Sequence, residues 1–192
     1  MTILITGGTS SIGRVLVKEL ARRGETLRVL VRPNSDRTGL DLPGVEFLPG
    51  DVTNPVSVRE AVQGCQFVCH LAAVVGSQVP EAVWWRVNRD GTQIVLQAAL
   101  DAGVRAMVQV SSLSVLGNTE PGETADESHL PDPSMYRNLY QKTKRAADDL
   151  AREYACLGLR VAIVYPGFGY GHSWASSHPS LQDQTLDRKS VV

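Results

Sequence analysis

Three polar side chains in the second half of the sequence have the types and spacing for exchanging a proton with a carbonyl oxygen. Tyr140 and Lys144 lie four residues apart in a segment with helical periodicity, so both would emerge on one helix face, one turn from each other. An ammonium beside a phenol favours the phenolate, which makes a tyrosine a usable proton donor or acceptor near neutrality. Solvated helices also carry this pair by chance, so the spacing alone leaves a surface role open.

The third side chain is Ser112, which follows an apolar segment that we predict to be a strand ending at Ser111. In a parallel sheet, ligands bind beyond the carboxyl ends of the strands. A hydroxyl at this edge would lie where a substrate carbonyl binds. We therefore expect Ser112 to share a site with Tyr140 and Lys144.

The start of the chain carries a glycine-rich turn. The stretch Thr2–Gly13, TILITGGTSSIG, joins a short apolar run to this turn, and helical spacing resumes at Ile12. We expect Gly7 to take a backbone conformation closed to other residues and Gly13 to let the helix pack tightly on the strand. A small side chain at Ser10 lets the main chain approach a pyrophosphate, to which the helix N-terminus offers unpaired N–H groups and a positive dipole end. Glycine-rich turns also end ordinary strands, so this motif alone is weak.

Apolar strands and amphipathic helices alternate along most of the chain, which predicts an α/β fold with a parallel sheet covered by helices on both faces. After the first strand, we predict strands at 26–31, 45–48, 67–71, 106–111 and 160–165. After the first helix, we predict helices at 55–62, 81–102 and 134–157. The polar segment 117–133 is expected to line a substrate pocket, because loops between chemistry-bearing elements often do.

Composition narrows the partners. The chain has 19 basic and 20 acidic residues without a basic block, so neither nucleic acid nor an anionic membrane is expected as a partner. No targeting segment or apolar run long enough to span a bilayer precedes or interrupts the pattern, which indicates a cytoplasmic protein. The three cysteines have no partners at zinc-site spacing, so we expect reduced thiols and no metal. His70, beside Cys69 in a predicted strand, is interpreted as a core histidine.

Six motifs in order resemble the extended short-chain dehydrogenase/reductase family, of the NAD-dependent epimerase/dehydratase type. They are TGGTSSIG at 6–13, GDVTN at 50–54, LAA at 71–73, NRDGT at 88–92, VSSLSVLG at 110–117 and YQKTK at 140–144. The resemblance covers about residues 2–171. It implies a doubly wound Rossmann sheet that binds NAD(P) and a small-molecule carbonyl or alcohol substrate.

The resemblance also implies roles for individual residues. Ser112, Tyr140 and Lys144 match the catalytic triad: Tyr140 would exchange a proton with the substrate oxygen, Ser112 would hold that oxygen, and Lys144 would act on the tyrosine and bind the nicotinamide ribose. Asn88 matches a helix position near the site, and a buried structural role is an equal alternative. The positions that match cofactor contacts are Gly7, Thr9, Ser10, Ser11, Ile12, Gly13, Asp51, Val52, Leu71, Ala72, Ala73, Ser111, Tyr140, Lys144, Pro166, Gly167 and Phe168.

Several positions depart from the family pattern. Ser10 replaces the middle glycine of the first turn, where its hydroxymethyl group would either crowd the pyrophosphate or donate a hydrogen bond to it. Leu116 and Tyr165 stand where the family often has tyrosine and arginine, which weakens any claim to nucleotide-sugar chemistry. Leu116, with LVRPNSD at 30–36 and VYPGFGYG at 164–171, resembles the dihydroflavonol reductase-like branch.

Arg32 bears on the choice of cofactor. It follows the second predicted strand, where NAD-preferring members place an acid that holds the ribose 2′-hydroxyl. A guanidinium there, with Ser35 and Arg14 nearby, suits the 2′-phosphate of NADP. We therefore predict a preference for NADP(H), with NAD(H) also possible; a solvated arginine at a strand end is the alternative.

The end of the chain suggests a truncated member of this family. We assign residues 1–171 to the NAD(P)-binding domain and 172–192 to an irregular tail, because members continue into a smaller substrate-binding region that is largely missing here. The last six residues, DRKSVV, also match what a sequencing adapter encodes. The function that we favour is that of an NAD(P)(H)-dependent reductase or epimerase. A homodimer is a possible assembly. A non-catalytic NADP-sensing module and an inactive fragment of the enzyme are the alternatives.

Overall fold

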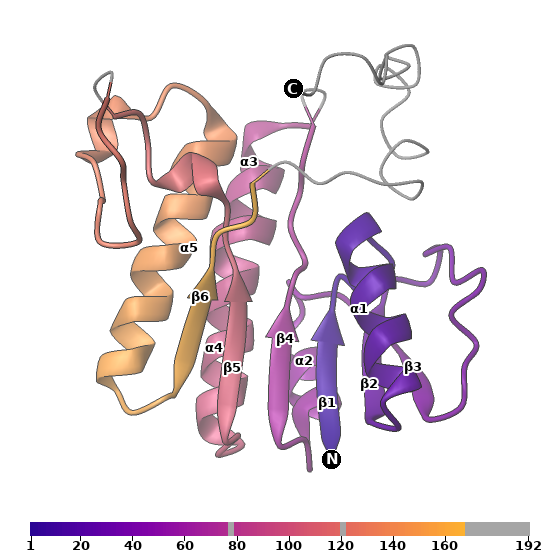
Figure 1. Cartoon of the computed structure of the whole chain (residues 1–192). Coiled ribbons are helices and arrows are strands. Elements are labelled where there is room, and N and C mark those ends of the chain that lie inside the picture. The colour runs from indigo at the N-terminus through magenta and orange to yellow at the C-terminus, as the bar shows by residue number, and fades with distance from the viewer. Residues whose placement is uncertain (77–78, 120–121, 168–192) are drawn as a thin grey trace.

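A six-stranded parallel sheet forms the centre of the computed structural model, which describes residues 1–76, 79–119 and 122–167. The strands are β1 (Thr2–Thr6), β2 (Thr26–Val31), β3 (Val45–Pro49), β4 (Phe67–His70), β5 (Ala106–Val110) and β6 (Val161–Val164). Their order in the sheet is β3-β2-β1-β4-β5-β6, and each neighbouring pair is parallel (Figure 1). The direction of winding reverses between β1 and β4, as in a doubly wound Rossmann fold, so the predicted fold class is confirmed.

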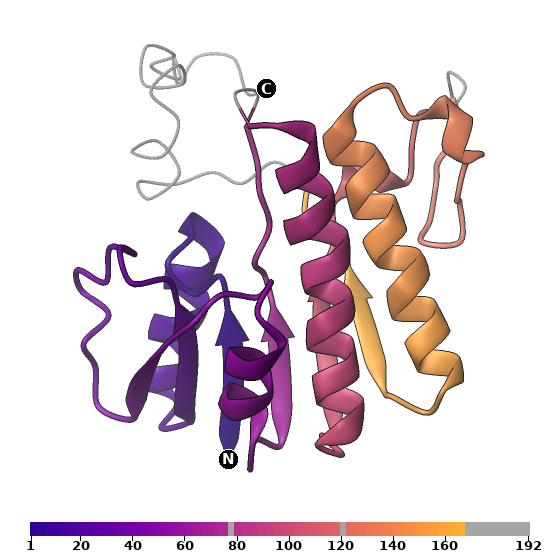
Figure 2. The ribbon, with the colours of Figure 1, turned by 180° about the vertical axis from the view of Figure 1, so that it is seen from behind.

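Helices cover both faces of this sheet. The helix α1 (Ser11–Arg22) lies on one face, whereas α2 (Pro55–Val62), α4 (Gly91–Asp101) and α5 (Leu139–Cys156) lie on the other (Figures 1 and 2). Side chains along β1 alternate between the two faces of the sheet. Leu4 packs in the hydrophobic cluster under α2, α4 and α5, while Ile3 and Ile5 pack in the hydrophobic cluster under α1. Because the central strands are buried on both faces, they read as continuous apolar runs.

The predicted helix at 81–102 is interrupted. It consists of α3 (Glu81–Trp84), a π-helical segment η1 (Trp85–Asp90) and α4. The amide of Gly91 donates to the carbonyl of Arg86, which is the i→i−5 pattern of a π-helix. A Cβ on Gly91 would come within 3.0 Å of Val52 Cγ2, so this wider turn brings the helix backbone close to the segment after β3.

The predicted helix at 134–157 starts five residues too early. The chain first makes a short 3-10 turn, η3 (Pro133–Met135), and α5 begins at Leu139. Asn138 caps α5, because its side-chain oxygen accepts a hydrogen bond from the amide of Gln141 at 2.9 Å. Tyr140 and Lys144 therefore lie in the first two turns of this helix. Among the helices of the described residues, none is long and apolar enough to cross a membrane.

Candidate active site

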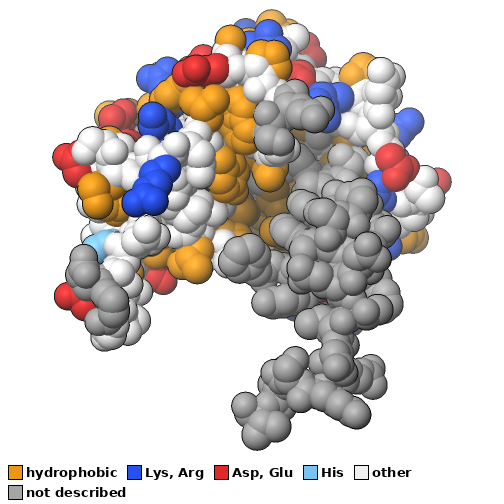
Figure 3. Space-filling model, turned by 90° about the horizontal axis from the view of Figure 1, so that it is seen from above, with side chains coloured by type: hydrophobic (Ala, Val, Ile, Leu, Met, Phe, Trp, Pro, Cys, Tyr) orange, Lys and Arg blue, Asp and Glu red, His pale blue; other side chains and the backbone are white. Residues whose placement is uncertain are grey.

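A cleft of about 590 Å³ opens at the carboxyl ends of β1, β2 and β4, within the range of small-molecule sites. Figure 3 looks down on this end of the molecule, where hydrophobic side chains gather in a central hollow. The predicted cofactor residues that line the cleft are Gly7, Thr9, Ser10, Arg32, Asp51, Val52, Leu71, Ala72 and Ala73. The structure thus brings four separate sequence motifs to one cavity.

The glycine-rich turn forms the floor of the cleft. Gly7 has a φ of +73°, and a Cβ there would lie 2.6 Å from the backbone nitrogen of Ala72. A Cβ on Gly13 would overlap the carbonyl oxygen of Gly7 and the backbone of Gly8. The expected conformation of Gly7 is confirmed, and Gly13 allows α1 to approach the turn itself. A bulkier residue at either position would collide with the backbone that forms the floor of the cleft.

Ser10 is the N-cap of α1. Its hydroxyl oxygen accepts a hydrogen bond from the amide of Gly13 at 3.1 Å, while its side chain lines the cleft. The hydroxyl hydrogen is still available to donate, so capping and anion binding are compatible. Ser11 and Ile12 form the first turn of α1, and Ile12 is 43% exposed.

The rim of the cleft beyond β2 carries Arg32. Arg32 lines the cleft together with Ser35, and its side chain makes no hydrogen bond or ion pair within the described part of the chain. The expectation that Arg14 assists it is wrong. Arg14 donates to the carbonyls of Thr9 and Thr38, and it forms an ion pair with Asp36 at 2.7 Å. Its donors therefore hold the turn after β2 instead of facing the cleft.

Asp51 and Val52 form the opposite wall. The Asp51 carboxylate accepts hydrogen bonds from the amide and the hydroxyl of Thr53, both at 2.8 Å. Val52 is 7% exposed and packs beneath the cleft. These contacts fix the short segment after β3 in place, so a planar ring entering the cleft would meet an ordered apolar surface.

Lys144 is buried just beside this cleft. Its ammonium donates to the carbonyl oxygen of Val110 at 2.6 Å, and the residue is 4% exposed. Burial lowers the pKa of Lys144 to about 8, whereas the nearby Asp148 carboxylate acts in the opposite direction. The single bond to Val110 leaves the other ammonium hydrogens for a ligand or a phenolate.

Tyr140 and Ser112 lie on the two elements that Lys144 joins. The Tyr140 ring packs edge-on against Trp84, with 6.1 Å between ring centroids, and Trp84 donates to the carbonyl of Val79 on the cleft wall. The Ser112 hydroxyl lies 2.9 Å from the hydroxyl of Ser114. Within the described residues no hydrogen bond joins Tyr140 to Ser112 or Lys144, and the cleft lining does not include these three residues. They lie around the end of β5 and the start of α5, two strands along the sheet from β1 and its glycine turn.

Two buried polar residues near Lys144 make hydrogen bonds that link separate elements. Asn88 bridges the amide and carbonyl of Val74 and donates to Thr143, which ties the segment after β4 to α5. His70 sits between the hydroxyls of Thr6 and Thr92, at 2.6 and 3.0 Å. Burial, aided by Lys144, lowers the pKa of His70 to about 3. Among the described residues no cluster of acidic, histidine and cysteine side chains could hold a metal.

The segment after β6 runs beside the segment after β5. The carbonyl of Pro166 accepts from the amide of Leu113 at 3.0 Å, and a Cβ on Gly167 would lie 3.7 Å from Leu113. These contacts place Pro166 and Gly167 next to the Ser112 strand end. Phe168, the last predicted cofactor residue, lies outside the described residues, as does the predicted tail.

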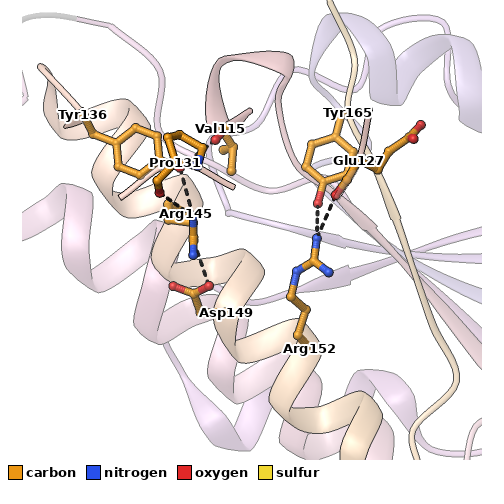
Figure 4. A network of polar contacts seen from close by, with 8 residues as sticks. All are labelled: Val115, Glu127, Pro131, Tyr136, Arg145, Asp149, Arg152 and Tyr165. Atoms are coloured by element: carbon orange, nitrogen blue, oxygen red, sulfur yellow. Dashed lines mark hydrogen bonds and ion pairs between the residues drawn. The ribbon is translucent and has the colours of Figure 1, made fainter. Parts of the chain in front are cut away.

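The loop at 117–133, which we expect to line a substrate pocket, lies beside α5. Its described residues pack against α5 and do not line the cleft. Arg145 donates to the carbonyl of Pro131 and pairs with Asp149 at 2.8 Å, while Arg152 donates to the carbonyl of Glu127 and the hydroxyl of Tyr165 (Figure 4).

Sequence reasoning missed part of the cleft wall. Val79, Val83, Arg86 and Val87 line it from the start of α3 through η1. Arg86 is exposed and, within the described part of the chain, its side chain has no hydrogen bond or ion pair. These residues belong to no motif, and only the position of η1 over the cleft reveals them.

Comparison with known proteins agrees with this arrangement. A sequence model of the NAD dependent epimerase/dehydratase family matches residues 3–187. The 4-hydroxy-2-methyl-3-oxo-4-farnesyl-3,4-dihydroquinoline-1-oxide ketoreductase of Stigmatella aurantiaca is 32% identical over 95% of this chain and 54% of its own length. A protein of Synechocystis sp. assigned by name as a dihydroflavonol 4-reductase is 32% identical over 87% of this chain and 49% of its own length.

Among solved structures, DesIV from Streptomyces venezuelae is similar. This dTDP-glucose 4,6-dehydratase, whose structure contains NAD, matches with a TM-score of 0.75 at 30% identity, over 85% of this chain and 54% of its own. The chain spans about half the length of these relatives. With its Rossmann sheet and its family match over most of its length, the chain belongs to the NAD dependent epimerase/dehydratase family.

Proposed function

We propose that this chain carries the cofactor site and the proton-transfer residues of an NADP(H)-dependent reductase of small-molecule carbonyls. The observation that supports it most is the position of Lys144. Its ammonium is buried and held by Val110 at the end of β5, one helical turn from Tyr140 and beside the strand end that carries Ser112. An apolar side chain would fill this buried position at a lower free-energy cost than an ammonium. The charge of Lys144 is therefore better explained by a functional role than by a structural one.

The cleft fits a dinucleotide. The Cβ-free cradle at Gly7 and Gly13 and the N-terminus of α1, a helix of 12 residues, suit a pyrophosphate. Asp51 and Val52 would contact the adenine end of the dinucleotide, and Lys144 would bind the nicotinamide ribose. When bound, the nicotinamide supplies the hydride for the substrate carbon.

The chain's own residues supply the proton. Tyr140 donates its hydroxyl proton to the substrate oxygen as negative charge develops there, and Ser112 donates a hydrogen bond to the same oxygen. The Lys144 ammonium then stabilises the phenolate that Tyr140 becomes. The apolar side chain of Trp84 excludes water from one edge of the tyrosine ring. Reversal of these steps oxidises an alcohol.

The preference for NADP(H) rests on the arginines around the turn after β2. Asp36 is the one acid between Arg32 and Thr38, and the ion pair with Arg14 neutralises it. The guanidinium of Arg37 lies 5.5 Å from the centre of the Phe47 ring. Arg32 therefore provides a positive charge, without a protein partner in the described residues, at the position where a 2′-phosphate would bind.

The test is turnover in the complete reading frame that encodes this chain. We expect that protein to oxidise NADPH with members of a panel of aldehydes and ketones. Tyr140→Phe should abolish turnover and keep NADPH binding. Tyr154→Phe is the matched control, since that hydroxyl bonds Gln97 on α4, away from the cleft. NADPH binding without turnover on any substrate would contradict the proposal and favour the sensing module.

A further inference from the structure

A group of buried polar atoms lies behind Lys144, and the proposed proton transfer does not use it. Both carboxylate oxygens of Asp148, the hydroxyl of Ser111 and Nε of Arg152 are buried without a hydrogen-bond partner in the described part of the chain. Asp148 is fully buried, with 0% of its surface exposed, and Ser111 is 5% exposed. Orphaned polar atoms of this kind are rare in folded proteins, and a concentration of them beside an active site calls for a functional explanation.

Asp148 faces charged and polar groups on α5 and at the ends of β5 and β6. On α5, Lys144 lies one turn before it and Arg152 one turn after. From the sheet, the hydroxyls of Ser111 after β5 and Tyr165 after β6 lie close enough to affect its ionisation. Burial raises the pKa of the Asp148 carboxyl above its ordinary value, while the two hydroxyls and the two cations act in the opposite direction and support the carboxylate.

The hydroxyl of Tyr165 lies between Arg152 and Asp148. It accepts a hydrogen bond from Arg152 at 3.0 Å, as Figure 4 shows. Burial, with the Asp148 charge adding to it, raises the pKa of Tyr165 to about 12. Tyr165 therefore keeps its proton at neutral pH and turns a donor, not a second negative charge, toward Asp148.

Two other polar groups beside Lys144 cannot balance its charge. One is the carbonyl oxygen of Val110, which is neutral. The other is His70, whose ring stays neutral because its pKa lies near 3. Asp148 is the carboxylate that acts on Lys144, although no ion pair within 4.0 Å joins them in the described residues.

From this arrangement we infer that Asp148 is a positioning residue, whose buried carboxylate keeps the Lys144 ammonium charged beside Tyr140. The inference rests on the proposed function, in which a charged Lys144 stabilises the phenolate. Without the carboxylate, burial of Lys144 would be unopposed and the neutral amine would be favoured. A neutral Lys144 could still fill its space and bond Val110, so the fold would survive while the proton transfer would slow.

The charge on Lys144 can be measured directly. The sequence has four lysines, at positions 18, 142, 144 and 189, so protein labelled with ¹³Cε-lysine should give one resolved NMR signal for each, with Lys144→Met assigning the signal of interest. In the wild type we expect Lys144 to titrate with a pKa of about 8. In Asp148→Asn the same signal should titrate at clearly lower pH. Asp149→Asn, which removes the neighbouring carboxylate that pairs with Arg145, should leave it unchanged.

Activity provides the second readout. In the complete protein, Asp148→Asn should lower kcat/KM at pH 7 by about tenfold, with partial recovery at lower pH, where Lys144 regains its proton. Asp148→Glu should restore the wild-type profile if it folds. An unchanged Lys144 titration in Asp148→Asn would overturn the inference. If Asp148→Asn does not fold, the same Lys144 titration is measured in Asp148→Ser, whose side chain is neutral and smaller. A wild type without turnover would contradict the proposed function alone, because the NMR titration still decides the role of Asp148.

Discussion

Gly7→Ala offers a stringent test of the proposed cradle, because the chain contains its own control. Gly7 and Gly64 both have a φ of +73°, so an alanine at either position is forced into the left-handed region. At Gly64 nothing lies within 4 Å of an added Cβ. At Gly7 the Cβ would lie 2.6 Å from Ala72 N and 2.8 Å from both Ala72 Cα and the carbonyl carbon of Leu71.

The two substitutions should therefore differ in energy by the cost of the contact. The left-handed conformation costs about 1–2 kcal/mol in each case, partly offset by the smaller entropy of the unfolded chain, so Gly64→Ala should lose about 1 kcal/mol. At Gly7 the backbone after β4 must also move. That backbone bonds Thr6 through Leu71 N at 3.0 Å and Ala72 N at 3.4 Å. Weakening these bonds adds about 1 kcal/mol each, for a total of about 3 kcal/mol.

Urea unfolding followed by circular dichroism measures both losses, and NADPH fluorescence measures binding. We expect Gly7→Ala to lose about 2 kcal/mol more stability than Gly64→Ala and to weaken NADPH binding at least about tenfold. Gly64→Ala should bind NADPH like the wild type. Equal stability losses, or unchanged binding in Gly7→Ala, would refute the close approach and the cradle built on it.

Three further outcomes are expected. Arg32→Asp should reverse the preference for NADPH over NADH, measured as the ratio of the two Kd values, while Arg105→Asp at the other end of the sheet should not; an unchanged ratio would count against Arg32 as the 2′-phosphate ligand. His70 has its pKa lowered to about 3, so the unfolded state binds the extra proton first and stability falls as pH drops from about 6.5 towards 3. His70→Gln should flatten the dependence of the urea midpoint on pH in that window, and an equally steep profile would contradict the assignment. Asn138→Ala should lower the free energy of unfolding by about 1 kcal/mol through loss of the cap on α5, and a change below the error of the urea titration would argue against that cap.

The sheet was predictable because each strand is a short apolar run between glycine, proline or polar residues. Strand boundaries agree to within about two residues, as for β4, predicted at 67–71 and observed as Phe67–His70. The helices were harder. Hydrophobic periodicity does not reveal the π-helical segment before Gly91, where the helix backbone lies close to Val52. Asn138, a residue type that favours the N-cap position, could have predicted the start of α5. The apolar pattern before it instead suggested an earlier start.

The residues of the candidate site also differ in how far the sequence could predict them. Motifs located the residues whose chemistry is local, such as Gly7 in its turn and Lys144 one turn after Tyr140. They could not locate residues that depend on packing between distant segments. Arg14 was misjudged because its partner, Asp36, lies 22 positions away, and the role that we propose for Asp148 was missed because it depends on burial against β5 and β6.

A structure of the protein with NADP⁺ bound tests the central claim most directly. We predict that the pyrophosphate lies over the turn between Gly7 and Gly13, and that the Lys144 ammonium donates to a hydroxyl of the nicotinamide ribose. The hydroxyls of Tyr140 and Ser112 should then face the nicotinamide ring from one side. A dinucleotide bound elsewhere, or a nicotinamide that points away from these three side chains, would contradict the account.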